Sequence, residues 1–300
     1  MLKKRDFAYG PFLALVFITL VWGINWVIMK RSMQYAGPHD FNALRMVLGG
    51  LSLFAYMVWK KRPLLPPFPV WTITIGLCQT TLGTVLMMAA IQTGGAGKTS
   101  ILFYTMPFWI LLLAWFILDE RLRGALWVPV VLALAGLILI LEPWAMGGIS
   151  LSKCLAVLSG VCWAMGVILV KLLGRGHKID LVSLTTWQIF FGSAPLVAIT
   201  VVFPGPPIEW SSFFIGSVLF NAVFVCGIVY LLWTYVIDRL PAGVVGLGSL
   251  ATPVIGVMAS RYHLGEEIGF WEGWGIVLIL AGLALLSLIR LRESKPGASR

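Results

Sequence analysis

The sequence predicts an all-α integral membrane protein with ten transmembrane helices, arranged as two inverted five-helix repeats around a central cavity. Three observations predict this fold class: an extreme apolar composition, long runs without charge, and positions that recur at a constant spacing. Of the 300 residues, 59% are hydrophobic and 11% are charged, whereas soluble domains are about 45–50% apolar and about 25% charged. This composition excludes a soluble fold, and it excludes a disordered chain, which requires low hydrophobicity.

Ten runs without charge mark the expected spans. In chain order they cover 7–29, 46–59, 63–97, 99–118, 124–141, 154–170, 181–208, 210–237, 240–260 and 273–289. All but the second hold at least 17 residues, which is long enough to cross about 30 Å of hydrocarbon at about 1.5 Å per residue. The second run extends back to Phe41 if Arg45 is accepted within the helix, as a buried or interfacial arginine. Continuous apolar runs also argue against a β-barrel, whose strands alternate.

The first run follows three basic residues and thus resembles a signal peptide. Its apolar part is too long for one, and no A-x-A cleavage site follows, so we expect a retained first span. The longest runs include their loops, which proline clusters mark at 63–69 and 204–207.

The basic residues predict the orientation of the chain. With ten spans, sixteen Lys and Arg residues fall on the side of the two termini and six fall on the other side. The positive-inside rule then places both termini in the cytoplasm of a bacterial-type inner membrane. The net charge of +10 is therefore interpreted as an orientation signal and not as a sign of nucleic-acid binding. Residues 293–300 are expected to form a short disordered cytoplasmic tail.

The two halves of the sequence repeat each other. Trp22 and Lys30 recur as Trp163 and Lys171, at an offset of 141 residues. At an offset of 146, the matches are 96–97 with 242–243, Pro107 with Pro253, Glu120 with Glu266, and Gly136 with Gly282. We therefore expect one five-helix repeat over 1–148 and a second over 149–292. An odd number of helices inverts the second copy, as in secondary transporters that bind substrate near the midplane between repeats.

Short motifs add a family resemblance to this pattern. The sequence has W-G-I-N-W at 22–26, L-D-E-R at 118–121 after Pro107, and L-G-E-E at 264–267 after Pro253. With the five-plus-five repeat, these features resemble the EamA family of the drug/metabolite transporter superfamily. Over its whole length the chain is most similar to YddG-type exporters of aromatic and hydrophobic amino acids. The resemblance implies export of small metabolites from the cytoplasm through a basket of helices.

Candidate substrate-binding residues are polar or aromatic side chains near the middle of spans. Trp22, Asn25 and Trp26 share one helix face, and Trp163 matches Trp22 in the second half. The nine candidates are Trp22, Asn25, Trp26, Gln79, Phe103, Tyr104, Trp163, Asn221 and Ser249. Intramembrane amides are costly without a partner and are therefore functional candidates. The alternatives are helix packing for the aromatic residues and interhelical hydrogen bonds for the amides.

Two prolines and two glutamates are expected to serve the transport cycle. Pro107 and Pro253 lie at matched positions within spans, where each ring would free the carbonyl four residues back, at Phe103 and Ser249. We expect both prolines to act as hinges. Glu120 and Glu266 lie at the far ends of these kinked helices near basic residues, and we expect gating or structural ion pairs.

The absence of acidic residues and histidines from the middle of the spans limits the possible coupling mechanisms and substrates. All twelve acidic residues lie near helix ends and the three histidines lie in loops, so no ion-coupling site is evident and coupling stays open between proton antiport and facilitated transport. The four cysteines show no metal-site spacing, and neither cofactor nor metal is expected. An aromatic cavity without charge suits neutral, aromatic or hydrophobic amino acids.

We therefore expect an alternating-access exporter of such amino acids and related small metabolites. Its partners are the amino-acid substrate and the lipid bilayer, without nucleic acid and without a required oligomer. A broad-specificity drug/metabolite exporter of the same fold is the main alternative. A channel or structural membrane protein is a further alternative. An integral-membrane enzyme is disfavoured, because no H-E-x-x-H or G-x-S-x-G motif occurs.

Overall fold

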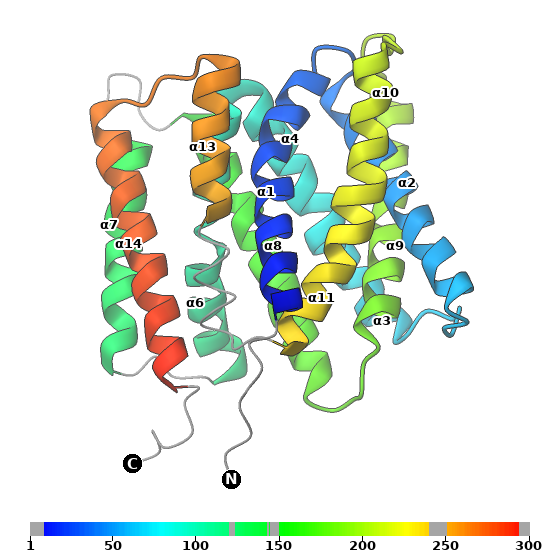
Figure 1. The fold of residues 1–300 in the computed structure, drawn as a ribbon, viewed down its shortest axis with the longest axis horizontal. Helices are drawn as coiled ribbons and strands as arrows, with labels where there is room; N and C mark the ends of the chain where they lie inside the picture. The colour runs from blue at the N-terminus through cyan, green and yellow to red at the C-terminus, as the bar shows by residue number, and fades with distance from the viewer. Residues whose placement is uncertain (1–8, 120–123, 143, 145–149, 240–250, 294–300) are drawn as a thin grey trace.

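The computed structural model describes residues 9–119, 124–142, 144, 150–239 and 251–293, and all regular elements in these ranges are helices (Figure 1). Nine helical segments within the described residues are long and apolar enough to cross a membrane. They are Gly10–Ser32, Pro38–Trp59, Pro69–Gly94, Ala96–Leu118, Gly124–Leu141, Leu151–Gly174, Leu181–Val202, Ser212–Trp233 and Phe270–Ile289. The protein is therefore a multi-pass membrane protein. The remaining expected span, 240–260, falls partly on 240–250, outside the described residues.

The first half of the chain forms helices that follow the predicted runs closely. They are α1 (Tyr9–Ser32), α2 (Pro38–Trp59), α3 (Pro69–Gly76), η1 (Leu77–Leu82), α4 (Gly83–Gly94), α5 (Ala96–Phe103), α6 (Met106–Leu118), η2 (Gly124–Leu126) and α7 (Trp127–Leu141). The short second run does extend backwards as predicted, because α2 begins at Pro38 and includes a fully buried Arg45. Pro38 and Pro69 start their helices at first-turn positions, where a missing N–H costs nothing.

The regular elements of the second half, within the described residues, are helices as well. Its elements are α8 (Leu151–Gly174), α9 (Leu181–Val202), α10 (Ser212–Leu219), η3 (Phe220–Ile228), α11 (Val229–Arg239), α13 (Ala251–Leu264) and α14 (Phe270–Glu293). The side chain of Asp180 caps α9 by accepting from the backbone amides of Val182 and Ser183. In Figure 1 the start of α1 and the end of α14 lie at the same end of the molecule.

Three spans are interrupted at mid-length. Both η1 and η3 are π-helical, and they occupy the middle of the third and eighth helical segments, respectively. The fourth segment breaks at Tyr104 and Thr105, between α5 and α6. Pro107 was expected to kink a continuous helix; it lies instead in the first turn of α6, just after this break. Single-turn π segments inside helices frequently mark functional sites.

Helices of one half pack mainly against helices of the other half. The contact of α4 with α8 of the other half has a counterpart in the contact of α11 with α1, and the contact of α6 with α8 has one in the contact of α13 with α1. Two further pairs, α2 with α9 and α7 with α14, join the halves directly; α7 and α14 lie side by side in Figure 1. A Cβ added at Gly136 of α7 would stand 2.6 Å from the carbonyl oxygen of Gly275 on α14, and the reverse distance is the same. The two backbones therefore touch, as small residues allow in membrane helices.

Candidate functional site

Four predicted site residues form one aromatic cluster at the break between α5 and α6. The ring of Phe103 lies 5.7 Å from Trp26, 5.8 Å from Tyr104 and 5.6 Å from Trp163, measured between ring centroids. Trp26, Phe103 and Tyr104 are buried and Trp163 is half-buried. These spacings match favourable aromatic pairs. Because Trp26 belongs to α1, Phe103 to α5 and Trp163 to α8, the aromatic cluster joins the two halves of the chain.

Local hydrogen bonds fix the break that carries the aromatic cluster. The Thr105 hydroxyl donates to the Leu102 carbonyl oxygen at 2.6 Å and accepts from the indole N–H of Trp109 at 3.0 Å. The Phe103 carbonyl was expected to be freed by Pro107. It faces α8, where a Cβ added at Gly160 would stand 3.0 Å from its oxygen. The end of α5 thus packs directly on the α8 backbone beside Trp163.

Gln79 of η1 reaches the same region but is held by two other helices, α8 and α9. Its side-chain amide donates to the Trp163 carbonyl oxygen at 3.1 Å, and its carbonyl oxygen accepts from the Gln188 amide at 2.9 Å. The Gln79 side chain also fills the space that a Cβ at Gly166 would need. The interhelical hydrogen bonds considered as the alternative for Gln79 are therefore present. Its contact with substrate stays a prediction.

Trp22 does not join the aromatic cluster, although it shares a helix face with Trp26. Its ring lies 5.4 Å from Trp233 and 6.3 Å from Tyr230, both on α11. The two tryptophans of α1 therefore contact different helices: Trp26 contacts α5, and Trp22 contacts α11. Trp22 would have to reach a ligand from the α11 side.

One further predicted residue, Asn221, lies in a polar cluster formed by α2, α4, α10 and η3. Asn221 of η3 donates to the Ser217 carbonyl oxygen at 3.0 Å and accepts from Arg45 Nη1 at 3.5 Å. Arg45 Nε donates to Asn42 Oδ1 at 3.1 Å, and the Asn42 amide donates to the Thr84 hydroxyl at 2.7 Å. Arg45 and Asn42 were missed from the sequence. The one available signal was the charge at position 45, which splits an apolar run and was interpreted as tolerated.

Asn25 is buried on α1 with an open acceptor. Among the described residues, no donor reaches its side-chain oxygen. A buried amide oxygen without a donor costs free energy, and such an atom needs an explanation. Asn25 is thus the one predicted amide that the described residues leave available to a ligand.

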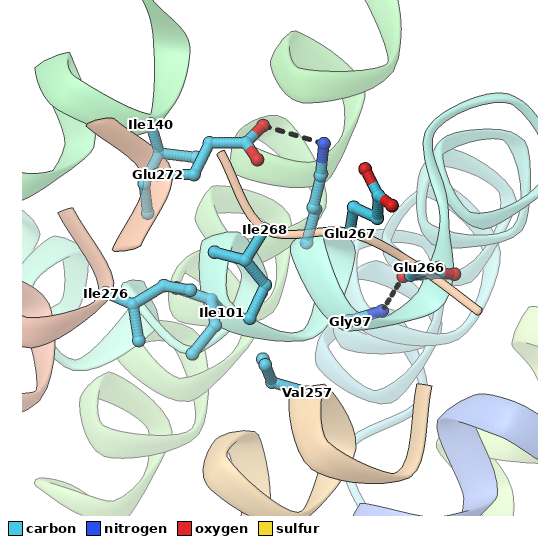
Figure 2. Close-up of a pocket in the computed structure, with 10 residues that line it drawn as sticks. Gly97, Ile101, Ile140, Val257, Glu266, Glu267, Ile268, Glu272 and Ile276 are labelled. Atoms are coloured by element: carbon cyan, nitrogen blue, oxygen red, sulfur yellow. Dashed lines mark hydrogen bonds and ion pairs between the residues drawn. The ribbon is translucent and has the colours of Figure 1, made fainter. Parts of the chain in front are cut away.

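Glu266 holds the turn between α4 and α5. Its two carboxylate oxygens accept from the backbone amides of Ala96 and Gly97 at 2.7 and 2.9 Å, and Figure 2 shows the second of these bonds. Lys30 of α1 donates to the carbonyl oxygens of Ile91 and Gln92 at the end of α4, at 2.7 Å each. Anions stabilise helix N-termini and cations stabilise C-termini. We call Lys30, Glu266 and the turn between them the end clamp. The partners of Glu266 are thus backbone amides where an ion pair was expected.

Charged side chains surround the end clamp. Lys98 pairs with Glu272 at 2.8 Å. Figure 2 shows Glu272 beside the pocket that Gly97 and Glu266 also line. Lys153 bridges Glu272 at 3.7 Å and Glu142 at 3.0 Å. These pairs tie α5, α8 and α14 together at the end of the bundle that is opposite the start of α1.

The remaining predicted residues give no site geometry. Ser249 and Glu120 lie outside the described residues. Pro253 lies on α13, and like Pro107 it keeps the hinge role only as a prediction. Within the described ranges, no three His, Cys, Asp or Glu side chains are grouped as a metal site requires.

A family model and several known transporters are similar to this chain over most of its length. The model of the EamA-like transporter family matches it twice, over residues 9–142 and 150–288. The uncharacterized transporter YoaV of Bacillus subtilis is 26% identical over 90% of this chain and 94% of its own length. The probable amino-acid metabolite efflux pumps of Salmonella typhimurium and Escherichia coli are 26% and 25% identical, over 91% and 89% of this chain and 92% and 91% of theirs.

One solved crystal structure has the same fold. It aligns with a TM-score of 0.66 at 20% sequence identity, over 96% of this chain and 99% of that one. The family and its named members are transporters and not enzymes. By the two matches of the family model, which cover most of its length, this chain belongs to the EamA-like transporter family.

Proposed function

We propose that the protein exports neutral, aromatic or hydrophobic amino acids, and related small metabolites, from the cytoplasm across the bacterial inner membrane. The observation that carries this proposal is the aromatic cluster, in which Phe103 contacts both Trp26 and Trp163. Aromatic rings from both halves offer stacking and dispersion contacts to an apolar side chain. The names of two relatives, as probable amino-acid metabolite efflux pumps, support the same class of substrate.

The proposed architecture has ten spans in two inverted repeats, over 1–148 and 149–292. Four observations support it: the double match of the family model, the exchanged helix pairs, the matched π-helices, and the shared end of α1 and α14. A return to the same end requires an even number of crossings, and α13 is a candidate for part of the tenth. Alternating access then follows from rocking one repeat against the other around the aromatic cluster.

We further propose that both termini face the cytoplasm and that lipid covers the outside of the bundle. The excess of basic residues on the side of the termini supports this orientation. Large apolar side chains on the perimeter, such as Phe116 and Phe270, are each 72% exposed. Patches of this kind on a helical bundle fit hydrocarbon chains. The end clamp then lies on the periplasmic side.

Counterflow in proteoliposomes tests the proposed substrate class. We expect saturable exchange of radiolabelled L-phenylalanine or L-methionine that empty liposomes do not show, measured with and without a pH gradient. Exchange of cationic dyes or other drugs at comparable rates would favour the broad-specificity alternative. No saturable exchange of any neutral amino acid would contradict the proposal.

Replacing Trp163 with alanine is expected to reduce L-phenylalanine counterflow roughly tenfold. The substitution removes one ring of the aromatic cluster. An aromatic pair is worth about 0.5–1.5 kcal/mol beyond the area that it buries. A free-energy difference of about 1.4 kcal/mol corresponds to a tenfold change in an equilibrium constant. Trp274→Ala is the matched control, because Trp274 is a 53% exposed tryptophan on α14. Counterflow should be normalised to the amount of protein in the membrane. Equal rates in the two variants would remove Trp163 from the site.

A further inference from the structure

We propose that Arg45 binds the carboxylate of the transported amino acid. This inference rests on the proposed function and adds to it the group that recognises one end of the substrate. The aromatic cluster contacts an apolar side chain but provides no charge for the substrate's own carboxylate.

Arg45 is a buried cation without an anion. Its side chain is on α2, about 10 Å along the span from Pro38 at about 1.5 Å per residue, and the residue is 3% exposed. Among the described residues, no carboxylate lies within 4.0 Å of its guanidinium. Charged groups within membrane spans are costly and are retained where they pair or bind. A carboxylate brought in by the substrate would supply the missing negative charge.

The neighbours of Arg45 orient the guanidinium and leave its charge uncompensated. Asn42 accepts from Nε at 3.1 Å and is itself held by the Thr84 hydroxyl. Asn221 accepts from Nη1 at 3.5 Å, the long limit for a hydrogen bond, and is held by the Ser217 carbonyl. Both partners are neutral amides. Amide partners fix a direction for the side chain while its full positive charge stays available.

One nitrogen of the guanidinium lacks a hydrogen-bond partner among the described residues. This nitrogen, Nη2, is buried. Because the Nη1 bond to Asn221 is long, a carboxylate oxygen can replace it and form two parallel bonds with Nη1 and Nη2. Two parallel bonds are the geometry in which arginine binds carboxylates most strongly. Lysine cannot reproduce this geometry.

Asn25 offers the complementary group for a zwitterion. Its side-chain oxygen is a buried acceptor without a donor among the described residues, and an ammonium group is a donor only. Helix α1, which carries Asn25, and helix α2, which carries Arg45, both contact η3. The two unpartnered polar atoms therefore belong to helices that share a neighbour. An α-amino acid carries one group for each of them.

The test compares L-phenylalanine with L-phenylalaninamide, which lacks only the carboxylate. Both compounds are added as competitors of radiolabelled L-phenylalanine counterflow, with wild-type protein and the Arg45→Gln, Arg45→Lys and Arg62→Gln variants. In the wild type we expect the amide to inhibit at least tenfold more weakly than the amino acid. Arg45→Gln should weaken L-phenylalanine at least tenfold and bring the two competitors within twofold of each other. Arg45→Lys should retain the preference in reduced form.

The variants keep the two proposals separable. Arg62→Gln is the matched control, since Arg62 follows α2 directly and pairs with Asp180 at the end of the bundle; its preference should equal that of the wild type. Size-exclusion chromatography in detergent shows whether Arg45→Gln is folded. If it is not, the preference of the wild type for the carboxylate, compared with that of Arg45→Lys, tests the role of Arg45. Transport without a preference for the carboxylate, or an unchanged preference in Arg45→Gln, overturns the role of Arg45 alone. No neutral amino-acid transport by the wild type overturns both proposals.

Discussion

Replacing Glu266 with alanine is expected to raise the accessibility of the α5 start at least tenfold. The substitution removes two charge-assisted hydrogen bonds, of 2.7 and 2.9 Å, to the amides of Ala96 and Gly97. Bonds to charged groups are worth about 1.5–3 kcal/mol each, and we take the low end because Glu266 is half-buried. About 1.4 kcal/mol is already a factor of ten. The equilibrium between a closed and an open end clamp should therefore shift at least tenfold toward the open form.

Thiol labelling measures this opening. Ser100 is fully buried one turn beyond Gly97, and Ser100→Cys would report its exposure once the four native cysteines are replaced. A membrane-impermeant maleimide should label this site at least tenfold faster in Glu266→Ala. The matched control is Glu267→Ala, because Glu267 is the exposed neighbour in the same turn. Equal labelling rates in the two variants would refute the clamp.

Replacing Gly136 with alanine is expected to destabilise the protein by about 1–3 kcal/mol, the usual cost of overpacking. The added Cβ would stand 2.6 Å from the Gly275 carbonyl oxygen and 3.1 Å from the Ile279 amide nitrogen. Both are backbone atoms, so no side chain can turn away, and α7 and α14 must separate. Gly275→Ala should do the same from the other helix. The double variant should cost less than the sum, because one separation accommodates both methyl groups.

Gly216→Ala is the matched control for this pair. Gly216 is also helical, and a Cβ there meets nothing within 4 Å. Alanine should be neutral or slightly stabilising at this position, since glycine is the poorer helix former by about 1 kcal/mol. Thermal unfolding of purified protein in detergent measures the difference. A Gly136→Ala midpoint equal to that of Gly216→Ala would show that the helices are not in contact.

The spans could be predicted because lipid imposes a simple rule on sequence. An apolar run of sufficient length must satisfy its backbone internally, which leaves a helix. The same rule accounts for α2, where Arg45 was tolerated within the run and the helix does continue through it. The function of Arg45 was not predictable in this way. Whether a buried arginine meets a carboxylate depends on which helices face it, and those come from distant parts of the chain.

The site was predictable in part, for a related reason. Side-chain type and depth selected Trp26, Phe103, Tyr104 and Trp163, and these do form one cluster. Helical spacing put Trp22 on the same face of α1 as Trp26, but the ring of Trp22 contacts α11 and not this cluster. One face of a helix can thus contact more than one neighbouring helix. The π-helices had no sequence signal that propensity could detect. Their extra residue per turn is set by packing against neighbouring helices and not by local preference.

The exchange of helix partners between the halves has a consequence for biogenesis. The partners of α1 include α13, which begins at Ala251, so more than 200 residues must be synthesised after Ser32 before that contact can form. At a synthesis rate of about 5–20 residues per second, the contact between α1 and α13 can form only about 10–45 s after α1 has been made. During that time the buried amide of Asn25 faces lipid or the insertion machinery. Helix α1 must therefore stay in the membrane before this contact forms, and it is long and apolar enough to do so.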